Sequence, residues 1–460
     1  MKTEVIEKLK QICGNDFATN DLSQIQGYLY DETENLIRPE ASKECIVVKP
    51  SSSEEISEIL KYANEKLIPV VSRGGGTGVV SGVIPTRPSI IISLERLNKL
   101  VELDEKNLMI TVESGVTLAS LLEILSNSSD LFFPVHPGDE GAQIGGMVAT
   151  NAGGTGAVKH GIMRNHVKAL EIVLPTGELV TLGGKLLKNN MGYDLLHLII
   201  GSEGTLGIIT KVTLRLYAKS NYSGTLVVSF DSTRDAANSV PAILQSGITP
   251  RAIEYVERSI AIKAAKHIGT TWPSENGSVD LIFIIDGSSE DELYDTSEKI
   301  VEICEANNAV DSIIAESSKE QKRILDIRSN VYTPYKEHVA DGLDMAVPPS
   351  SIPDFIDDIT RIAKKYNTEI PSAGHIGDGN IHNFILTDEN GNLPSYYEEF
   401  KKELYKTALK YGGTITAEHG TGKTKKNYMS LQYTDREIKI MEGIKKVFDP
   451  NNILNCGNIV

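Results

Sequence analysis

Cysteine is scarce in this sequence, and its placement excludes several kinds of site. The 460 residues contain four cysteines, Cys13, Cys45, Cys304 and Cys456, which lie far apart and never form a CxxC pair. A disulfide framework, a zinc ribbon or an iron–sulfur cluster needs closely spaced cysteines. We therefore expect none of these in this chain.

Positive charge is also in deficit. Lys and Arg number 46 against 62 Asp and Glu, a formal net charge of −16, and aromatic residues make up only 6%. Nucleic-acid binding needs clustered Lys and Arg that contact phosphates. The composition therefore argues against a nucleic-acid partner. An acidic surface suits a soluble enzyme, including one that docks a basic partner protein.

Long apolar runs are missing as well. No stretch reaches the roughly 18 consecutive apolar residues of a transmembrane helix. The first residues, MKTEVIEKLKQICG, have apolar residues at helical spacing with charges between them and no apolar h-region. This pattern predicts a surface helix, and we expect a cytoplasmic protein without a transmembrane segment.

The length of the chain predicts two or three domains. Residues 1–217 combine strands and helices with glycine clusters, including a hairpin in ALEIVLPTGELVTL and a loop-rich stretch at 132–154. After this point strands and helices alternate with few glycine clusters. We expect an N-terminal domain over 1–217, a second domain over 218–410 and a C-terminal segment over 411–460.

Three glycine-rich segments fall in the first domain: RGGGTGVVSG (73–82), IGGMVATNAGGTG (144–156) and GSEGTLGIIT (201–210). Glycine lets backbone N–H groups approach an anion closely. The first segment follows an apolar strand but lacks the third glycine of the Rossmann fingerprint, and alone it could equally be a structural turn. Three such segments together suit an extended dinucleotide better than a simple phosphate.

Residues 73–78, 145–154 and 201–207 resemble the FAD-binding domain of the vanillyl-alcohol-oxidase superfamily, also called the PCMH type. The chain is similar, from about residue 40 to 460, to its branch of D-lactate dehydrogenases, glycolate oxidase subunits and D-2-hydroxyglutarate dehydrogenases. The resemblance implies an α+β fold with a two-lobed FAD-binding domain. It also implies an α+β cap domain with an antiparallel sheet, and a C-terminal segment that returns to the FAD domain.

The resemblance also implies that FAD is bound without a covalent bond, with residues 73–78 around the pyrophosphate. His136, in a Pro-His-Pro stretch, is more simply interpreted as a packing residue. The residues assigned to FAD are Arg73, Gly74, Gly75, Gly76, Thr77, Gly78, Gly82, Pro137, Gly138, Ile144, Gly145, Gly146, Thr150, Asn151, Ala152, Gly154, Glu203, Gly204, Gly207, Ile209 and Asn380.

Two histidines in GHIGDGNIH, His375 and His382, flank a Gly-Asp-Gly turn. A strand–turn–strand at this place would let both imidazoles reach one divalent metal. Glu418, in the second glycine-bounded segment TAEHGTGKTKK, supplies a carboxylate to complete a three-ligand set. The residues alone leave two structural histidines equally possible; the resemblance of both motifs to the family favours a metal site, and Zn, Fe(II) and Mn all suit it.

The resemblance implies that such a site oxidises a 2-hydroxy acid. His419, next to Glu418, is the candidate base, because an imidazole titrates near working pH. Arg328 matches the position of the family's substrate-binding arginine, although an arginine on a helix is more often a surface residue. Asn380 is equally well a turn residue or a group that contacts flavin or substrate.

The tripeptide Gly422-Lys423-Thr424 suggests a different interpretation, a loop that binds a nucleoside triphosphate. That loop requires a glycine where this chain has Ala417. We therefore set the triphosphate reading aside.

The sequence departs from the family pattern at several positions near the site. Relatives that act on dicarboxylates carry an Asn where this chain has Phe384, with Asn383 one place earlier, and a basic residue where it has Pro349. Cys456 and Asn458 replace the usual Pro and Lys of the tail. Fewer cations favour a small D-2-hydroxy monocarboxylate such as D-lactate, with glycolate or D-2-hydroxyglutarate as alternatives.

The electron acceptor is expected to be separate from this chain. The sequence has neither a nicotinamide fingerprint nor cluster ligands, and the resemblance suggests an electron-transfer flavoprotein or an iron–sulfur subunit as acceptor. A further alternative is a non-catalytic flavin module that only relays electrons.

Overall fold

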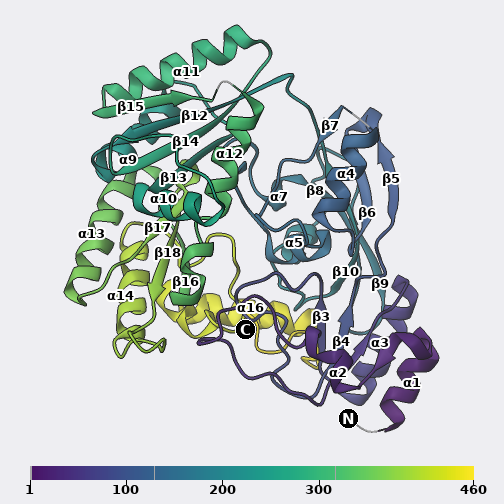
Figure 1. The fold of residues 1–460 in the computed structure, drawn as a ribbon. Coiled ribbons are helices and arrows are strands. Elements are labelled where there is room, and N and C mark those ends of the chain that lie inside the picture. The colour runs from purple at the N-terminus through teal and green to yellow at the C-terminus, as the bar shows by residue number, and fades with distance from the viewer. Residues whose placement is uncertain (1–2, 129, 316) are drawn as a thin grey trace.

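The computed structural model describes residues 3–128, 130–315 and 317–460, which form two lobes connected at the base by the C-terminal segment (Figure 1). Within the described residues, the first lobe holds a four-stranded sheet and a five-stranded sheet, and the second lobe holds a seven-stranded sheet. The C-terminal residues contribute to both lobes. This arrangement places the junction between the lobes at the candidate site.

The smaller sheet of the first lobe is mostly parallel. Its strand order is β1 (Ala18–Thr19), β2 (Ile46–Val48), β4 (Ile90–Ser93), β3 (Val70–Arg73), with only β1 antiparallel to its neighbour. β2 and β4 are continuous apolar runs buried on both faces, as strands of a parallel sheet must be. Helices α1 (Thr3–Cys13) and α3 (Ser53–Lys66) pack against this sheet, and Ser52 caps α3 by accepting from the Glu55 N–H.

The second sheet of the first lobe is antiparallel. Its order is β5 (Leu100–Asp104), β6 (Met109–Glu113), β10 (Ile208–Arg215), β8 (Val167–Val173), β9 (Leu179–Gly183). β8 and β9 form the predicted hairpin, with Gly177 at a φ of +84° in its turn. Helices α4 (Leu118–Ser128) and α5 (Ile144–Thr150) cover its apolar face.

Helix α5 lies inside the stretch predicted to be loop. Tertiary contact explains the difference, since a Cβ at Gly145 would lie 2.6 Å from the Ser114 Cβ. Glycine here lets the helix approach the end of β6 closely, and this packing outweighs the low helix propensity of Gly145 and Gly146.

The second lobe contains the expected antiparallel sheet, of seven strands within the described chain. Their order is β15 (Ala309–Ile314), β12 (Tyr222–Phe230), β14 (Val279–Gly287), β13 (Ala252–Glu257), β17 (Ser372–His375), β18 (Asn380–Leu386), β16 (Val339–Ala346). Alternate residues of β12 point to opposite cores: Val228 packs into one and Val227 into the other.

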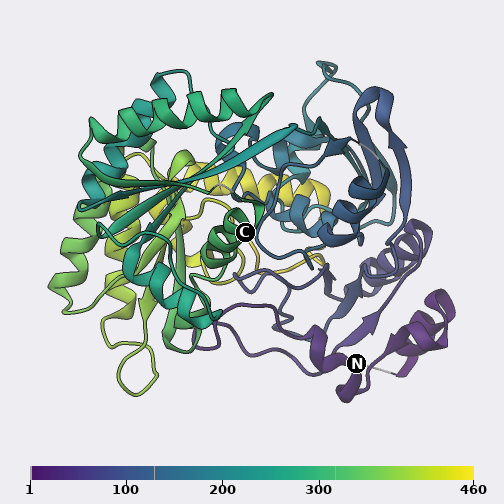
Figure 2. The ribbon, with the colours of Figure 1, turned by 45° about the horizontal axis from the view of Figure 1, so that its top comes forward.

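Helices cover both faces of this sheet (Figure 2). One core is built with α9 (Thr233–Gln245), α11 (Glu290–Glu305), α13 (Ile352–Lys365) and α14 (Tyr397–Lys410). The other is built with α10 (Arg258–His267) and α12 (Ser318–Ser329). The edge strand β16 contacts the C-terminal segment through bridges between Asp344 and Thr416 and between Ala346 and Thr414.

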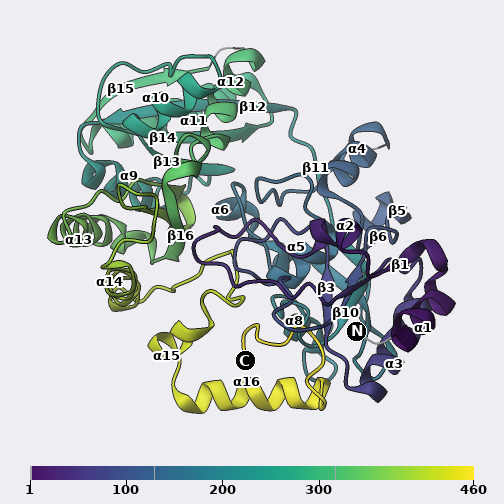
Figure 3. The same ribbon diagram turned by 60° about the horizontal axis from the view of Figure 1, so that its bottom comes forward.

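The C-terminal segment returns to the first lobe, as expected. After α15 (Met429–Gln432), helix α16 (Asp435–Phe448) runs from the second lobe to the first (Figure 3). The tail then pairs with β3: the Val70 N–H donates to the Ile453 carbonyl at 2.7 Å, and the Asn455 N–H donates to the Val70 carbonyl at 2.8 Å. The tail thus extends the β3 edge of the parallel sheet.

Short elements complete the chain. They are α2 (Leu22–Ile25), β7 (Leu131–Phe132), α6 (Ala157–His160), α7 (Met163–His166), α8 (Leu195–Ile199) and β11 (Tyr217–Ala218), with 3-10 turns η1 (Asn15–Phe17), η2 (Gln26–Tyr28), η3 (Glu105–Asn107), η4 (Thr333–His338), η5 (Pro349–Ser351), η6 (Ile376–Asp378) and η7 (Lys426–Tyr428). None of the helices in the described residues is long and apolar enough to cross a lipid bilayer.

Candidate active site

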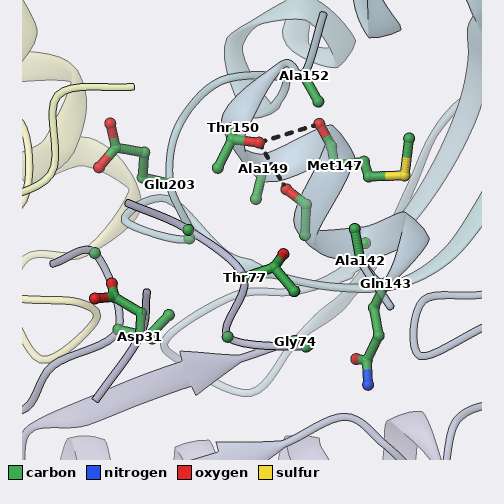
Figure 4. Close-up of a pocket in the computed structure, with 18 of the residues that line it drawn as sticks. Asp31, Gly74, Thr77, Ala142, Gln143, Met147, Ala149, Thr150, Ala152 and Glu203 are labelled. Atoms are coloured by element: carbon green, nitrogen blue, oxygen red, sulfur yellow. Dashed lines mark hydrogen bonds between the residues drawn. The ribbon is translucent and has the colours of Figure 1, made fainter. Parts of the chain in front are cut away.

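A cavity lies in the first lobe between the glycine segments. Figure 4 shows Gly74 and Thr77, on the loop after β3, on one side and Ala149 and Thr150 of α5 on the other, with Glu203 at one end. The cavity continues to Glu418 and His419 of the C-terminal segment and to tail residues Asn455 and Asn458. Loops separated by more than 300 residues in sequence therefore share one cavity.

Most of the residues assigned to FAD line this cavity. They are Gly74, Gly75, Gly76, Thr77, Gly78, Gly82, Pro137, Gly145, Gly146, Thr150, Ala152, Glu203, Gly204, Gly207 and Ile209. Arg73, Gly138, Ile144, Asn151, Gly154 and Asn380 do not line it. The sequence interpretation also missed residues that do, among them Asp31, Gln143 and Asn455.

The residues away from the cavity wall support the loops instead. The Arg73 guanidinium donates to the Tyr30 carbonyl at 2.9 Å and to the Gly27 carbonyl at 3.2 Å, beneath the glycine loop. Asn151 ends α5 with a backbone φ of 54°. Its side-chain oxygen accepts from the Arg164 N–H at 3.0 Å and so fixes the end of the helix. These contacts hold the backbone of the cavity in shape.

The polar groups of the cavity fit an FAD molecule. In the described chain, the backbone N–H groups of residues 75–78 have no acceptor in the protein. A Cβ at Gly78 or Gly146 would meet no atom within 4 Å, and the buried side-chain oxygen of Gln143 has no hydrogen-bond partner. Unpaired N–H groups of this kind are where a phosphate binds.

The predicted metal ligands converge beside this cavity. β17 ends at His375, the turn η6 reverses the chain, and β18 carries His382, as the sequence predicted. The Glu418 Oε1 lies 3.7 Å from the Nε2 of His375 and 3.5 Å from the Nε2 of His382. Two imidazole nitrogens and one carboxylate oxygen so close together are a donor set that suits a divalent metal.

A buried carboxylate orients His375. The Nδ1 of His375 lies 2.8 Å from the Oε1 of Glu254, which leaves Nε2 for a metal, the arrangement that metal-binding histidines commonly have. Burial lowers the pKa of His375, but the Glu254 carboxylate outweighs it and raises that pKa to about 9. Sequence reasoning missed Glu254; the available signal was a charged residue inside the apolar strand AIEYVE.

Arg328 lies on the other side of Glu254. Its Nη2 is 2.6 Å from the Glu254 Oε2, and its guanidinium is mostly buried. Its Nε has no hydrogen-bond partner among the described residues. Arg328 is therefore an ion-pair partner of Glu254 and is not among the residues that line the cavity.

His419 follows Glu418 and belongs to the same cluster, with one ring nitrogen within 4.8 Å of a ligand atom of His382 and of Glu418. Its ring stacks on that of His382, with centroids 5.3 Å apart and an interplanar angle of 11°. Its Nδ1 is buried 3.8 Å from the Oδ2 of Asp344. Burial lowers the pKa of His419 below its usual value despite Asp344, so the ring is neutral near pH 7 and can accept a proton.

Asn380 does not face the cavity. Its Nδ2 donates to the Oδ1 of Asp344 at 2.9 Å and to the Met345 carbonyl at 3.0 Å, between β18 and β16. Asp344 itself was missed by sequence reasoning. One carboxylate oxygen of Asp344 and one ligand atom each of His382, Glu418 and His419 all lie within 4.8 Å of one another.

Comparisons with known proteins agree with this arrangement. Residues 45–183 match the family model described as FAD binding domain, and residues 219–459 match the model described as FAD linked oxidases, C-terminal domain. A D-lactate dehydrogenase of Archaeoglobus fulgidus is 40% identical over 94% of this chain and 95% of its own. The glycolate oxidase subunit GlcD of Bacillus subtilis is 33% identical over 99% and 96%.

Solved structures confirm the fold. p-Cresol methylhydroxylase superposes with a TM-score of 0.78 at 17% identity, over 99% of this chain and 96% of its own. The 4-ethylphenol oxidase of Gulosibacter chungangensis gives 0.79 at 17% identity over the same shares. The PCMH-type fold expected from the glycine segments is thus confirmed.

Proposed function

Since this chain belongs to the family of FAD-linked oxidases, we propose that it oxidises a small D-2-hydroxy acid, D-lactate first, to the 2-oxo acid. It does so with bound FAD and one divalent metal held by His375, His382 and Glu418. The observation that carries the proposal is the continuity of the glycine-lined cavity with Glu418 and His419. The two halves of the reaction, hydride acceptor and acid–base group, then meet at one place.

Each residue has a definite task in this reaction. Bound FAD supplies the hydride acceptor, and a bound divalent metal acidifies the substrate hydroxyl. Arg328, which matches the position of the family's substrate-binding arginine, binds the substrate carboxylate. The Nδ1 of His419 faces Asp344, so its Nε2 accepts the hydroxyl proton, and the Asp344 carboxylate stabilises the imidazolium that results.

The surroundings of the site support a small monocarboxylate. Phe384 lies two residues after His382 on β18 and thus on the same face of the strand. Its ring packs edge-on against that of Tyr332, with centroids 5.5 Å apart. The Phe384 ring offers no donor to the second carboxylate of a dicarboxylic acid, and the Tyr332 hydroxyl already donates to the Glu34 carboxylate. Four relatives above 30% identity carry D-lactate dehydrogenase in their names, one of them as probable, which agrees with this choice.

The reduced flavin passes its electrons to a separate acceptor, an electron-transfer flavoprotein or an iron–sulfur subunit. The four cysteines of the chain are all free and lie apart, so they do not bind a cluster. Incubation of the single chain with D-lactate and NAD is expected to give no substantial NADH. Rapid NADH formation would contradict a separate acceptor.

Anaerobic bleaching of the flavin by a panel of acids tests the proposed substrate. The panel contains D-lactate, L-lactate, glycolate, D-malate and D-2-hydroxyglutarate. D-Lactate is expected to bleach the flavin fastest and L-lactate not at all. Preferential bleaching by glycolate or D-2-hydroxyglutarate would reassign the substrate, and no bleaching by any acid would leave a flavin module that only relays electrons.

A further inference from the structure

Asp344 is a buried carboxylate on β16, and it is paired with His382 on the neighbouring strand β18. Its Oδ2 accepts from three consecutive backbone N–H groups, those of Ala417 and Glu418 at 3.0 Å and that of His419 at 2.8 Å. One oxygen of the second lobe thus binds the backbone that carries both the carboxylate of the metal cluster and the candidate base.

Further donors saturate the same carboxylate. The Thr416 hydroxyl donates to Oδ2 at 3.0 Å, the Asn380 amide donates to Oδ1 at 2.9 Å, and the Lys425 Nζ lies 3.7 Å away. Consecutive N–H groups in a turn form a concave anion site, and hydrogen bonds to a charged acceptor are about twice as strong as neutral ones. With its lone pairs so occupied, Asp344 is a poor metal ligand despite its proximity to the cluster.

The other end of the turn is held by the first lobe. The buried Glu203 carboxylate accepts from the Thr421 N–H at 2.6 Å and from the Gly422 N–H at 2.9 Å. Glu203 also lines the cavity. The turn over residues 416–422 is therefore fixed between two buried carboxylates, one from each lobe.

We propose that Asp344 is the positioning residue of the active site, which places Glu418 against His375 and His382 and turns His419 toward the cavity. This inference rests on the proposed function. Its physical basis is that the three N–H groups need a strong acceptor, and loss of that acceptor leaves buried donors unpaired. The turn would then relax away from the strands that carry the histidines.

The variant Asp344→Asn tests this role, because it keeps the size of the side chain while replacing one oxygen with a donor. Asp341→Asn is the matched control: Asp341 is also buried on β16 but accepts from the Tyr397 hydroxyl at 2.8 Å and the Lys401 Nζ at 2.7 Å, away from the turn. Both variants remove one buried charge from the same strand. A general loss of stability should affect them alike.

Three properties are measured on the flavin-loaded proteins: FAD content, Co²⁺ affinity by calorimetry after chelation, and kcat and KM for D-lactate. Asp344→Asn is expected to keep its FAD but to bind Co²⁺ roughly 10–100-fold more weakly, with kcat lowered by a similar factor, as removal of groups that orient metal ligands usually does. Because Arg328 still binds the carboxylate, KM should change less than kcat.

Co²⁺ affinity and kcat within twofold of wild type in Asp344→Asn, or equal losses in Asp341→Asn, would overturn the positioning role. Failure of the proposed function gives a different result: wild-type protein that neither binds Co²⁺ nor is bleached by any 2-hydroxy acid. The two failures are therefore separable in one set of measurements.

Discussion

At the scale of one residue, burial sets the charge of His419, the proposed base. Burial lowers its pKa below 6.5, so the neutral ring dominates at pH 7. The neighbouring Asp344 carboxylate is positioned to stabilise the ring once it is protonated. At pH 7 the proposed base is therefore already in the neutral form that can accept a proton.

The first prediction concerns His419→Gln. Loss of a general base typically costs about 10²–10⁴-fold in rate, so kcat should fall within that range while FAD and metal contents stay unchanged. Rapid-reaction spectroscopy of the flavin measures the rate and the FAD content, and elemental analysis measures the metal content. If the metal were lost together with the activity, His419 would be a ligand rather than the base.

A second prediction at this scale concerns Gly153, which lines the cavity beside Glu418, one of the proposed metal ligands. A Cβ at Gly153 would lie 2.5 Å from the Oε2 of Glu418, so Gly153→Ala must displace that carboxylate. We expect its metal affinity to fall by roughly the 10–100-fold seen when ligand orientation is disturbed. Gly443→Ala is the control, because a Cβ on that exposed residue of α16 meets nothing within 4 Å. Unchanged metal affinity in Gly153→Ala would remove Glu418 from the ligand set.

At the scale of elements, Glu257 at the end of β13 makes stability depend on pH. Burial raises its pKa to about 7, against the hydrogen bond that it accepts from the Ser372 N–H. The folded protein then binds more protons than the unfolded chain between the ordinary pKa of 4.5 and about 7. Stability is therefore lost as pH rises through this window.

Glu257→Gln is the third prediction. The amide keeps an acceptor for Ser372 and removes the buried charge. At pH 8 the free energy of unfolding of the variant should therefore exceed that of wild type by up to about 2 kcal/mol, and its unfolding temperature should be higher. The difference should disappear below pH 4.5. Glu298→Gln, an exposed change on α11, should show no such trend. A variant no more stable than wild type at pH 8 would contradict the raised pKa.

Local patterns in the sequence predicted much of the architecture. Apolar alternation and turn residues predicted the β8–β9 hairpin, and the Gly-Asp-Gly turn predicted the strand–turn–strand that carries His375 and His382. Helix α5 was not predicted, because its glycines favour a loop in isolation and the helix depends on close contact with Ser114.

The groups that support the active site could not be predicted from local patterns. Glu254 reaches His375 because β13 pairs with β17, and Asp344 reaches His382 because β16 pairs with β18. These strand neighbours are up to 121 residues apart, and a single sequence does not reveal sheet order. The cluster of His375, His382 and Glu418 was predictable only through two short motifs and their family resemblance.

At the scale of the whole molecule, the C-terminal tail connects the chain's end to the flavin cavity. The Asn455 side chain accepts from the Ser72 N–H at 2.9 Å and donates to the Glu203 carbonyl at 2.6 Å. Asn455 also lines the cavity, and its φ of 39° is one that asparagine tolerates better than most residues.

The fourth prediction is that Asn455→Ala loses FAD. The variant leaves the half-buried Ser72 N–H unpaired, at a cost of about 1–3 kcal/mol, and loosens the loop after β3. Flavin retained after gel filtration and the temperature of flavin release should both fall. Asn451→Ala removes an exposed hydrogen bond to Asn64 from the same tail and should change neither. Full flavin retention in Asn455→Ala would show that the tail does not support the cavity.

The fifth prediction tests the meeting of flavin and metal chemistry most directly, through the rate at which D-lactate bleaches the flavin without oxygen. The measurement compares metal-loaded protein, protein after chelation, and chelated protein given back Zn²⁺ or Mn²⁺. We expect rapid bleaching of the metal-loaded protein, a loss of rate on chelation without loss of FAD, and recovery when metal returns. Bleaching at an equal rate in the chelated, verifiably metal-free protein would contradict it.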